Sequence, residues 1–75
     1  MKKTQYTSKT GLQLWRPVFD KEAENLVWEG TTGFCLACGE ETDGVEPDAR
    51  RYACPTCNEA KVFGLEELLL RGLLR

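Results

Sequence analysis

Four cysteines in two closely spaced pairs carry the clearest chemistry in this sequence. Cys35 and Cys38 form one C-x₂-C pair, and Cys54 and Cys57 form a second pair fifteen residues further along. This spacing is typical of a metal ion held by four thiolates, because each pair sits on a tight turn that directs two sulfurs into one concavity. Four protein ligands leave no open position on the metal, so the pattern predicts one structural Zn²⁺ rather than a catalytic one.

The residues that follow each pair fit such turns. Gly39 comes directly after the first pair, where the backbone often needs a positive φ. Asn58 occupies the matching place after the second pair, and asparagine is the residue that next best tolerates this conformation. We therefore expect two similar turns that face each other across the metal.

Iron and disulfides are the alternatives to zinc. The runs C-x-x-C-G and C-P-x-C resemble the two knuckles of rubredoxins, which hold iron. Rubredoxins place a longer segment between their knuckles, however, and their shared aromatic pattern is absent. Disulfides are disfavoured because nothing in the sequence indicates export and cytosolic thiols stay reduced. A thioredoxin-like redox pair needs a larger α/β scaffold. Zinc is the favoured prediction.

The chain contains no histidine and a single serine, Ser8. Without histidine there is no Ser-His-Asp triad, no Cys-His nucleophile pair and no histidine-ligated catalytic zinc. The cysteines are used by the predicted metal, and carboxylates such as Glu40, Glu41 and Asp43 have the pattern of a solvated face. We therefore do not expect an enzyme.

The length and the charge distribution further limit which class of protein this can be. A chain of 75 residues makes one domain, and so small a core usually needs a metal, disulfides or a partner for stability. The net charge of −2 is uneven: residues 1–16 carry +4, residues 17–30 carry −3, residues 31–49 carry −5 and residues 50–75 carry +2. No apolar run approaches the roughly 20 residues that span a bilayer, and no apolar segment follows the basic start as in a signal peptide.

The elements around the cysteines predict a zinc ribbon. Residues 34–36, 51–53 and 60–63 have the pattern of short strands, and Asp43-Gly44 is a strong turn signal. A helix is expected from about Leu65. The predicted fold is thus a small, mostly β, metal-stapled domain with a C-terminal α-helix. Residues 34–75 form this ribbon, and residues 1–33 form an N-terminal tail with a β-hairpin or a strand plus a short helix.

The six leucines of residues 65–74 cover a wider arc of the helix than a small domain buries. We expect the ribbon to be covered by Leu65, Leu68, Leu69 and Leu73. Leu70 and Leu74 then point elsewhere, and Gly72 is expected to end the helix early. These two leucines are simply exposed, or they fold onto the N-terminal segment, or they contact a partner or a second copy.

The N-terminal part leaves two alternatives open. Residues 12–16 alternate like a strand that ends at Pro17. Residues 20–28 form either a short helix with Asp20 as its N-cap, or a turn followed by a strand at 25–29 that pairs with residues 12–18. The hairpin is slightly favoured. Trp15 and Trp28 are expected in the core rather than as stacking platforms.

Residues 34–74 resemble zinc-ribbon proteins, and more narrowly a group of very short zinc-ribbon proteins of bacteria and their phages. Besides the cysteine pairs, the resemblance depends on D-G-V-E-P-D-A-R at residues 43–50 and V-F-G-L-E-E-L-L-L at residues 62–70. It implies a zinc ribbon in the cytoplasm of a bacterium or of a phage's host cell, and no particular activity. Residues 1–33 lie outside the resemblance.

A protein-interaction module is the favoured function, through a protein partner or a homodimer that uses the C-terminal helix. A related hypothesis is an acidic inhibitor that mimics nucleic acid or covers a basic site on a host enzyme. The candidate partner-binding residues are Leu70, Leu73, Leu74, Glu40, Glu41 and Asp43.

A nucleic-acid-binding ribbon related to transcription is the alternative function. The acidic net charge disfavours it, since nucleic-acid binding depends on phosphate neutralisation. Trp15 or Tyr52 would supply a stacking surface. The candidate residues are Lys2, Lys3, Lys9, Arg16, Arg50 and Arg51, together with Lys61.

Overall fold

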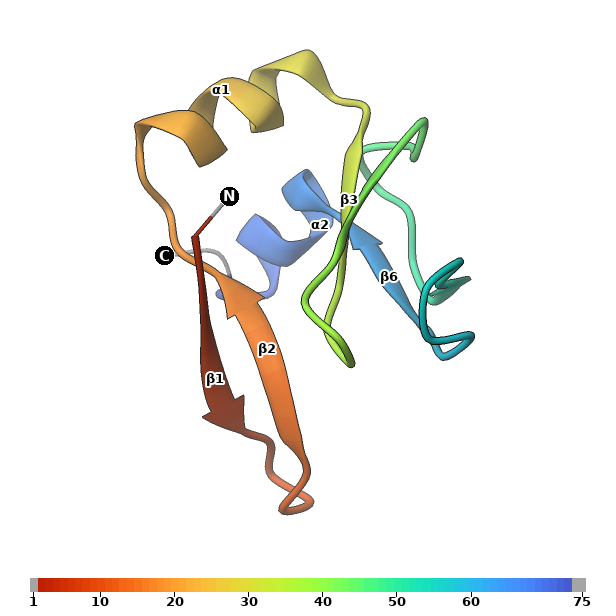
Figure 1. Ribbon diagram of the computed structural model, residues 1–75. Helices are drawn as coiled ribbons and strands as arrows, with labels where there is room; N and C mark the ends of the chain where they lie inside the picture. The colour runs from red at the N-terminus through yellow and green to blue at the C-terminus, as the bar shows by residue number, and fades with distance from the viewer. Residues whose placement is uncertain (1, 74–75) are drawn as a thin grey trace.

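The computed structural model describes residues 2–73, which form two small antiparallel sheets and two helices (Figure 1). The first sheet is a hairpin, and the second has the strand order β4-β3-β6-β5. In chain order the elements are β1 (Lys3–Thr7), β2 (Gln13–Pro17), α1 (Lys21–Glu29), β3 (Thr32–Cys35), β4 (Glu41–Asp43), β5 (Tyr52–Ala53), β6 (Ala60–Gly64) and α2 (Leu65–Leu70).

The predicted architecture is confirmed as a small, mostly β domain with a short C-terminal helix. The strands expected at 34–36, 51–53 and 60–63 are β3, β5 and β6, with ends shifted by one or two residues. β4, in the acidic segment, was not expected. It pairs with β3, with Gly33 opposite Thr42, and is one of the two edge strands of the four-stranded sheet.

The strand favoured at residues 25–29 is wrong, because these residues belong to α1. The Asp20 side chain accepts a hydrogen bond of 2.9 Å from the Ala23 N–H and so caps the first turn. Gly30 ends the helix at φ 74°, and its N–H bonds to the Leu26 carbonyl. The partner of β2 is instead β1, which precedes it. Residues 1–33 thus contain both a β-hairpin, formed by β1 and β2, and the short helix α1, and part of the expected tail is strand β1.

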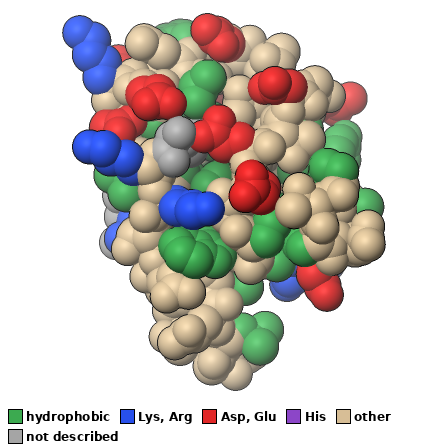
Figure 2. Space-filling model, in the orientation of Figure 1, with side chains coloured by type: hydrophobic (Ala, Val, Ile, Leu, Met, Phe, Trp, Pro, Cys, Tyr) green, Lys and Arg blue, Asp and Glu red, His purple; other side chains and the backbone are tan. Residues whose placement is uncertain are grey.

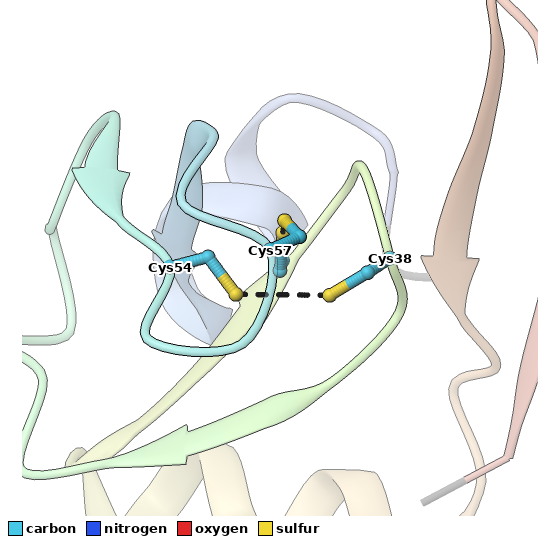
Figure 3. A group of neighbouring side chains, drawn as sticks. Cys38, Cys54 and Cys57 are labelled. Carbon is cyan, nitrogen blue, oxygen red and sulfur yellow. Dashed lines mark hydrogen bonds between the residues drawn. The ribbon is translucent and has the colours of Figure 1, made fainter.

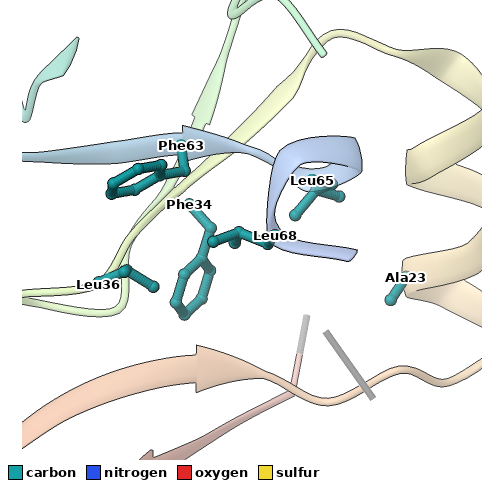
Figure 4. Close-up of a cluster of buried hydrophobic side chains, with 6 residues drawn as sticks. All are labelled: Ala23, Phe34, Leu36, Phe63, Leu65 and Leu68. Carbon is teal, nitrogen blue, oxygen red and sulfur yellow. The ribbon is translucent and has the colours of Figure 1, made fainter. Parts of the chain in front are cut away.

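One face of the four-stranded sheet carries the main core (Figure 4). Phe34 of β3 lies opposite Phe63 of β6 in the strand register, and both side chains are almost fully buried. They pack with Leu36, Leu65, Leu68 and Ala23, so both helices cover this face. The partly buried Trp15 packs against the same cluster, as expected, which joins the hairpin to the core.

The cysteine cluster lies on the opposite face of the four-stranded sheet. Strand alternation turns Cys35 and its register partner Val62 away from the phenylalanines. The loop after β4 covers them with Val45 and Ala49, and Cys54 joins this second cluster. The core and the cysteine cluster thus share the same two strands, β3 and β6.

The loop after β4 is tied to the start of α2. The Gly64 N–H donates to the Ala49 carbonyl at 3.0 Å, and the Glu67 N–H donates to the Pro47 carbonyl at 3.1 Å. The buried Glu67 carboxylate accepts from Arg50 Nε at 3.0 Å and from Arg71 Nε at 2.7 Å. Two charge-assisted bonds satisfy this carboxylate, which makes its burial tolerable.

Most leucine expectations hold for α2. Leu65 and Leu68 are buried, Leu73 packs on the main core and Leu70 is 77% exposed. Gly72, at φ 73°, follows the last turn, as expected of a residue that ends the helix. Leu69 was expected to cover the ribbon, but it is 41% exposed because its side of the short helix faces a groove. Leu74 lies outside the described residues.

The N-terminal elements are continuous with the cysteine-bearing half. β3 begins at Thr32, before the expected boundary at residue 33, and the Trp15 N–H bonds to the Leu36 carbonyl at 2.7 Å. Neither of the two described helices has the length and apolar composition that crossing a bilayer requires.

Candidate metal centre and binding surfaces

The four cysteine side chains converge between two turns. Figure 3 labels three of them, Cys38, Cys54 and Cys57. The first turn leaves the end of β3, and the second lies between β5 and β6. All four Sγ atoms lie within 4.8 Å of one another, and the Cys35–Cys57 and Cys38–Cys54 pairs are each 3.6 Å apart. The cluster therefore brings together all four residues that the spacing predicted.

The two turns are built alike. The Gly39 N–H bonds to the Cys35 carbonyl at 2.8 Å, and the Asn58 N–H bonds to the Cys54 carbonyl at 2.9 Å. Gly39 has φ 78° and Asn58 has φ 64°, so both adopt the predicted left-handed conformation. In each turn, backbone N–H groups also point at the first sulfur, which stabilises negative charge there.

The donor set fits a single metal ion. Four thiolates at about 2.3 Å from Zn²⁺ stand about 3.8 Å apart at the corners of a tetrahedron. The Sγ atoms, 3.6 Å apart in two pairs and all within 4.8 Å of one another, are close to this arrangement. All four cysteines are free thiols, and 3.6 Å is far beyond a disulfide bond. The structure thus supports a metal over disulfides, and zinc and iron fit the same geometry.

The thiols differ in their proton affinity. Burial raises the pKa of Cys35 to about 12 and also raises that of Cys38. The backbone N–H of Cys57, followed by that of Thr56, lowers the pKa of Cys54 to about 6. Metal binding must therefore displace protons from the first turn, while Cys54 offers a thiolate near neutral pH.

The hairpin packs on the first turn. The Trp15 ring and the aliphatic part of Lys3 lie directly over Gly39, where a Cβ atom would meet them at 3.1 and 2.8 Å. The Lys3 ammonium lies 5.0 Å from the Trp15 ring centroid and donates to the Gly39 carbonyl at 3.3 Å. A cation is thus held beside a turn that becomes negative when its thiols bind a metal.

An apolar groove of about 510 Å³ lies between the end of α1, the loop after β4 and α2. Trp28 is 82% exposed here, so its expected place in the core is wrong. In a helix, Ala23, Leu26 and Val27 share the core side, and Trp28 turns away from it. Helical periodicity was the signal that would have found this residue. The apolar groove is lined by Val27, Trp28, Gly30, Pro47, Glu66, Leu69 and Leu70.

A second groove, of about 570 Å³, is basic. Arg51, Lys61 and Arg71 line it, against a single acidic residue, Glu59. Arg71 lies 4.8 Å over the Phe63 ring. Among residues 2–73, neither Arg51 nor Lys61 makes an ion pair. The other residues lining this basic groove are Tyr6, Leu36, Ala60, Phe63 and Leu73.

The candidate partner-binding residues that the structure describes, which exclude Leu74, do not form one surface. Leu70 lines the apolar groove, whereas Leu73 packs on the core and lines the basic groove. Glu40, Glu41 and Asp43 are exposed on and beside β4, at the far edge of the sheet from β5.

The candidate nucleic-acid residues are also divided. Lys3 is engaged with Trp15 and Gly39, and Arg50 is engaged with Glu67. Lys2 and Lys9 are exposed and Arg16 is half-buried, all in or beside the hairpin. Arg51 and Lys61 alone meet in one concavity, the basic groove.

Comparison with known proteins yields no relative: no family model, no curated protein and no solved structure matches this chain.

Proposed function

We propose that this protein is a zinc-stapled interaction module that binds another protein through its apolar groove. The four-cysteine cluster supports the metal, and its closed ligand set supports a structural role. The resemblance to short zinc ribbons of bacteria and phages supports a bacterial or host-cell cytoplasm as its setting, with a host protein as the partner.

The exposure of Trp28 is the observation that carries this proposal. Trp28 and Leu70 are the two most exposed large hydrophobic side chains of residues 2–73, at 82% and 77%. Covering a tryptophan removes roughly 150–250 Å² from water. At about 25 cal/mol per Å², this stabilises a complex by about 4–6 kcal/mol before ordering costs. Tryptophan is also enriched among the residues that dominate binding energy.

The metal would act on this groove through the fold. Zn²⁺ bound by Cys35, Cys38, Cys54 and Cys57 fixes the two turns against each other. These turns hold β3 and β6 together, and the two strands carry the core on which both helices pack. The groove lies between those helices, so its shape depends on the metal without contact to it.

Quantitative capture from cells tests the proposal. We expect the metal-loaded protein to enrich a defined partner, with enrichment lost in Trp28→Ala and in Leu70→Ser. Leu12→Ser is the matched control, because Leu12 is 55% exposed in the hairpin and does not line the apolar groove. Equal capture by all four proteins would rule out the groove as the binding surface.

Nucleic-acid binding remains the second candidate function, and the basic groove favours it. Arg51, Lys61 and Arg71 outnumber Glu59 there, and Arg51 holds a positive φ of 55° that non-glycine residues rarely adopt. Titration with single-stranded DNA and RNA across salt tests this function. Arg51→Ala should weaken binding, and no binding at low salt would exclude this function.

A further inference from the structure

We infer that the apolar groove accepts a basic amphipathic helix from the partner, with its apolar side on Trp28 and Leu70 and its lysines or arginines over the rim. This inference rests on the proposed function and names the chemistry of the partner segment.

The backbone around the groove favours a helix over an extended segment. An added strand needs free N–H and carbonyl groups along an edge. The Gly30 N–H is bonded to the Leu26 carbonyl, the Pro47 carbonyl accepts from Glu67, and proline has no N–H to offer. A helix satisfies its own backbone and needs only apolar contact from such a surface.

The rim of the groove is acidic. Glu66 lines it, and Glu24 lies one helical turn before Trp28 on the same side of α1. Glu46 and Asp48 flank Pro47, and all four side chains are exposed. In Figure 2, acidic side chains gather over the upper half of the visible face, where α1 lies, with hydrophobic ones among them and basic ones along the left side.

The basic residues near this rim are engaged elsewhere. Arg50, two residues after Asp48, donates to Glu67 at 3.0 Å. None of the described residues that line the groove is lysine or arginine. Arg71 follows Leu70, but its Nε is tied to Glu67, and Lys21 lies at the other end of α1. Electrostatic attraction to the acidic rim therefore favours a positively charged partner segment.

The same rim disfavours a second copy of this chain as the occupant. Two copies joined through this groove bring Glu66 and its acidic neighbours together. Each chain has a net charge of −2, and four metal-bound thiolates add to it. Repulsion between like charges opposes such a dimer. The same repulsion opposes binding of a nucleic acid or an anionic membrane to this groove.

Binding of designed peptides tests the inference with the full, zinc-loaded protein. The probe is a fluorescent helical peptide of roughly 16 residues, with leucines at i, i+3, i+4 and i+7 and lysines on both sides. Its partner probe carries glutamate in place of every lysine, and a scrambled lysine peptide controls for charge alone. We expect anisotropy to report binding of the first peptide only, weakened by salt.

Variants locate the site. Trp28→Ala should weaken binding about 30-fold, as loss of a central anchor does. Glu66→Lys should weaken it about threefold, the effect of a rim ion pair. Glu59→Lys is the matched control, because it changes the net charge equally but lies in the basic groove. Equal effects of the two reversals would overturn the inference.

Three further outcomes would overturn the inference, and they distinguish its failure from a failure of the proposed function. Tighter binding of the glutamate peptide, lost in Trp28→Ala, would overturn the basic helix and leave protein binding standing. A dimer in solution that Trp28→Ala converts to monomers would overturn it in favour of self-association. Binding of the scrambled peptide equal to that of the ordered one would show attraction by charge alone and would also overturn it.

Discussion

The carbonyl of Pro47 lies directly against the Cα of Gly64, so a Cβ atom on Gly64 would overlap the backbone of the loop after β4. The backbone of Gly64 is ordinary, with φ −65° and ψ 150°. Glycine is therefore required here by space and not by conformation. This contact joins two segments that are separated in the sequence, the loop after β4 and the end of β6.

Gly64→Ala should destabilise the protein by about 3 kcal/mol, because the obstructing atoms are backbone and cannot rotate away. Gly44→Ala is the control: Gly44 has φ 75° but open space around it, so its substitution should cost about 1 kcal/mol. Urea unfolding of the zinc-loaded proteins measures both. A smaller loss for Gly64→Ala than for Gly44→Ala would contradict this packing.

Metal removal should unfold the domain. Structural zinc contributes an apparent 10–16 kcal/mol in small peptides, roughly as much as the whole net stability of a typical domain, about 5–15 kcal/mol. We expect one zinc per chain by elemental analysis, and loss of far-UV circular dichroism and amide dispersion on chelation or in Cys54→Ser. An unchanged amide spectrum in the chelated protein would refute the structural role, and bound iron would refute zinc.

The two tryptophans should behave oppositely. Trp15→Ala should cost about 2–3 kcal/mol and speed hydrogen exchange in β1 and β2, because Trp15 packs on the core and on Gly39. Trp28→Ala should change stability by less than about 0.5 kcal/mol, since its side chain is mostly in water. Exchange measured by NMR on both variants tests this, and equal losses would be inconsistent with these positions.

Glu67 should make the domain sensitive to acid. Its hydrogen bond from Arg71, followed by that from Arg50, holds its pKa below the ordinary value of 4.5. A depressed folded pKa stabilises the protein above the unfolded pKa, and this contribution is lost as the pH falls through the folded pKa. The stability difference between wild type and Glu67→Gln should therefore be full at pH 6–7 and shrink below about pH 4.5. Urea unfolding across pH measures it, and a side-chain NMR titration of Glu67 at or above 4.5 would contradict it.

The cysteine spacing predicted the metal-binding cluster, and alternation with turn signals predicted β3, β5 and β6. These features are local, because a C-x₂-C turn and a short strand are encoded by adjacent residues. The contacts of the charged side chains, in contrast, depend partly on residues that are distant in the sequence. Glu67 accepts from Arg71 one helical turn away, but also from Arg50 in the loop after β4, and Lys3 is engaged only because the hairpin packs over Gly39.

The prediction from sequence wrongly placed Trp28 in the core for a related reason. The run of residues 26–28 suits a strand by propensity, and tertiary packing of Ala23 and Leu26 decided for a helix. Once α1 is recognised, its periodicity places Trp28 in water. The Asp20 cap was the local signal that deserved more weight than strand propensity.

Strand order has a consequence for biosynthesis. β6 lies in the middle of the four-stranded sheet, yet it is the last of that sheet's four strands to be translated. Until residue 64 leaves the ribosome, β3 lacks one neighbour and Phe34 lacks its register partner Phe63. A prematurely terminated chain thus keeps an apolar strand uncovered and offers it to chaperones and proteases. The topology means that only a chain translated past residue 64 can bury this strand on both sides.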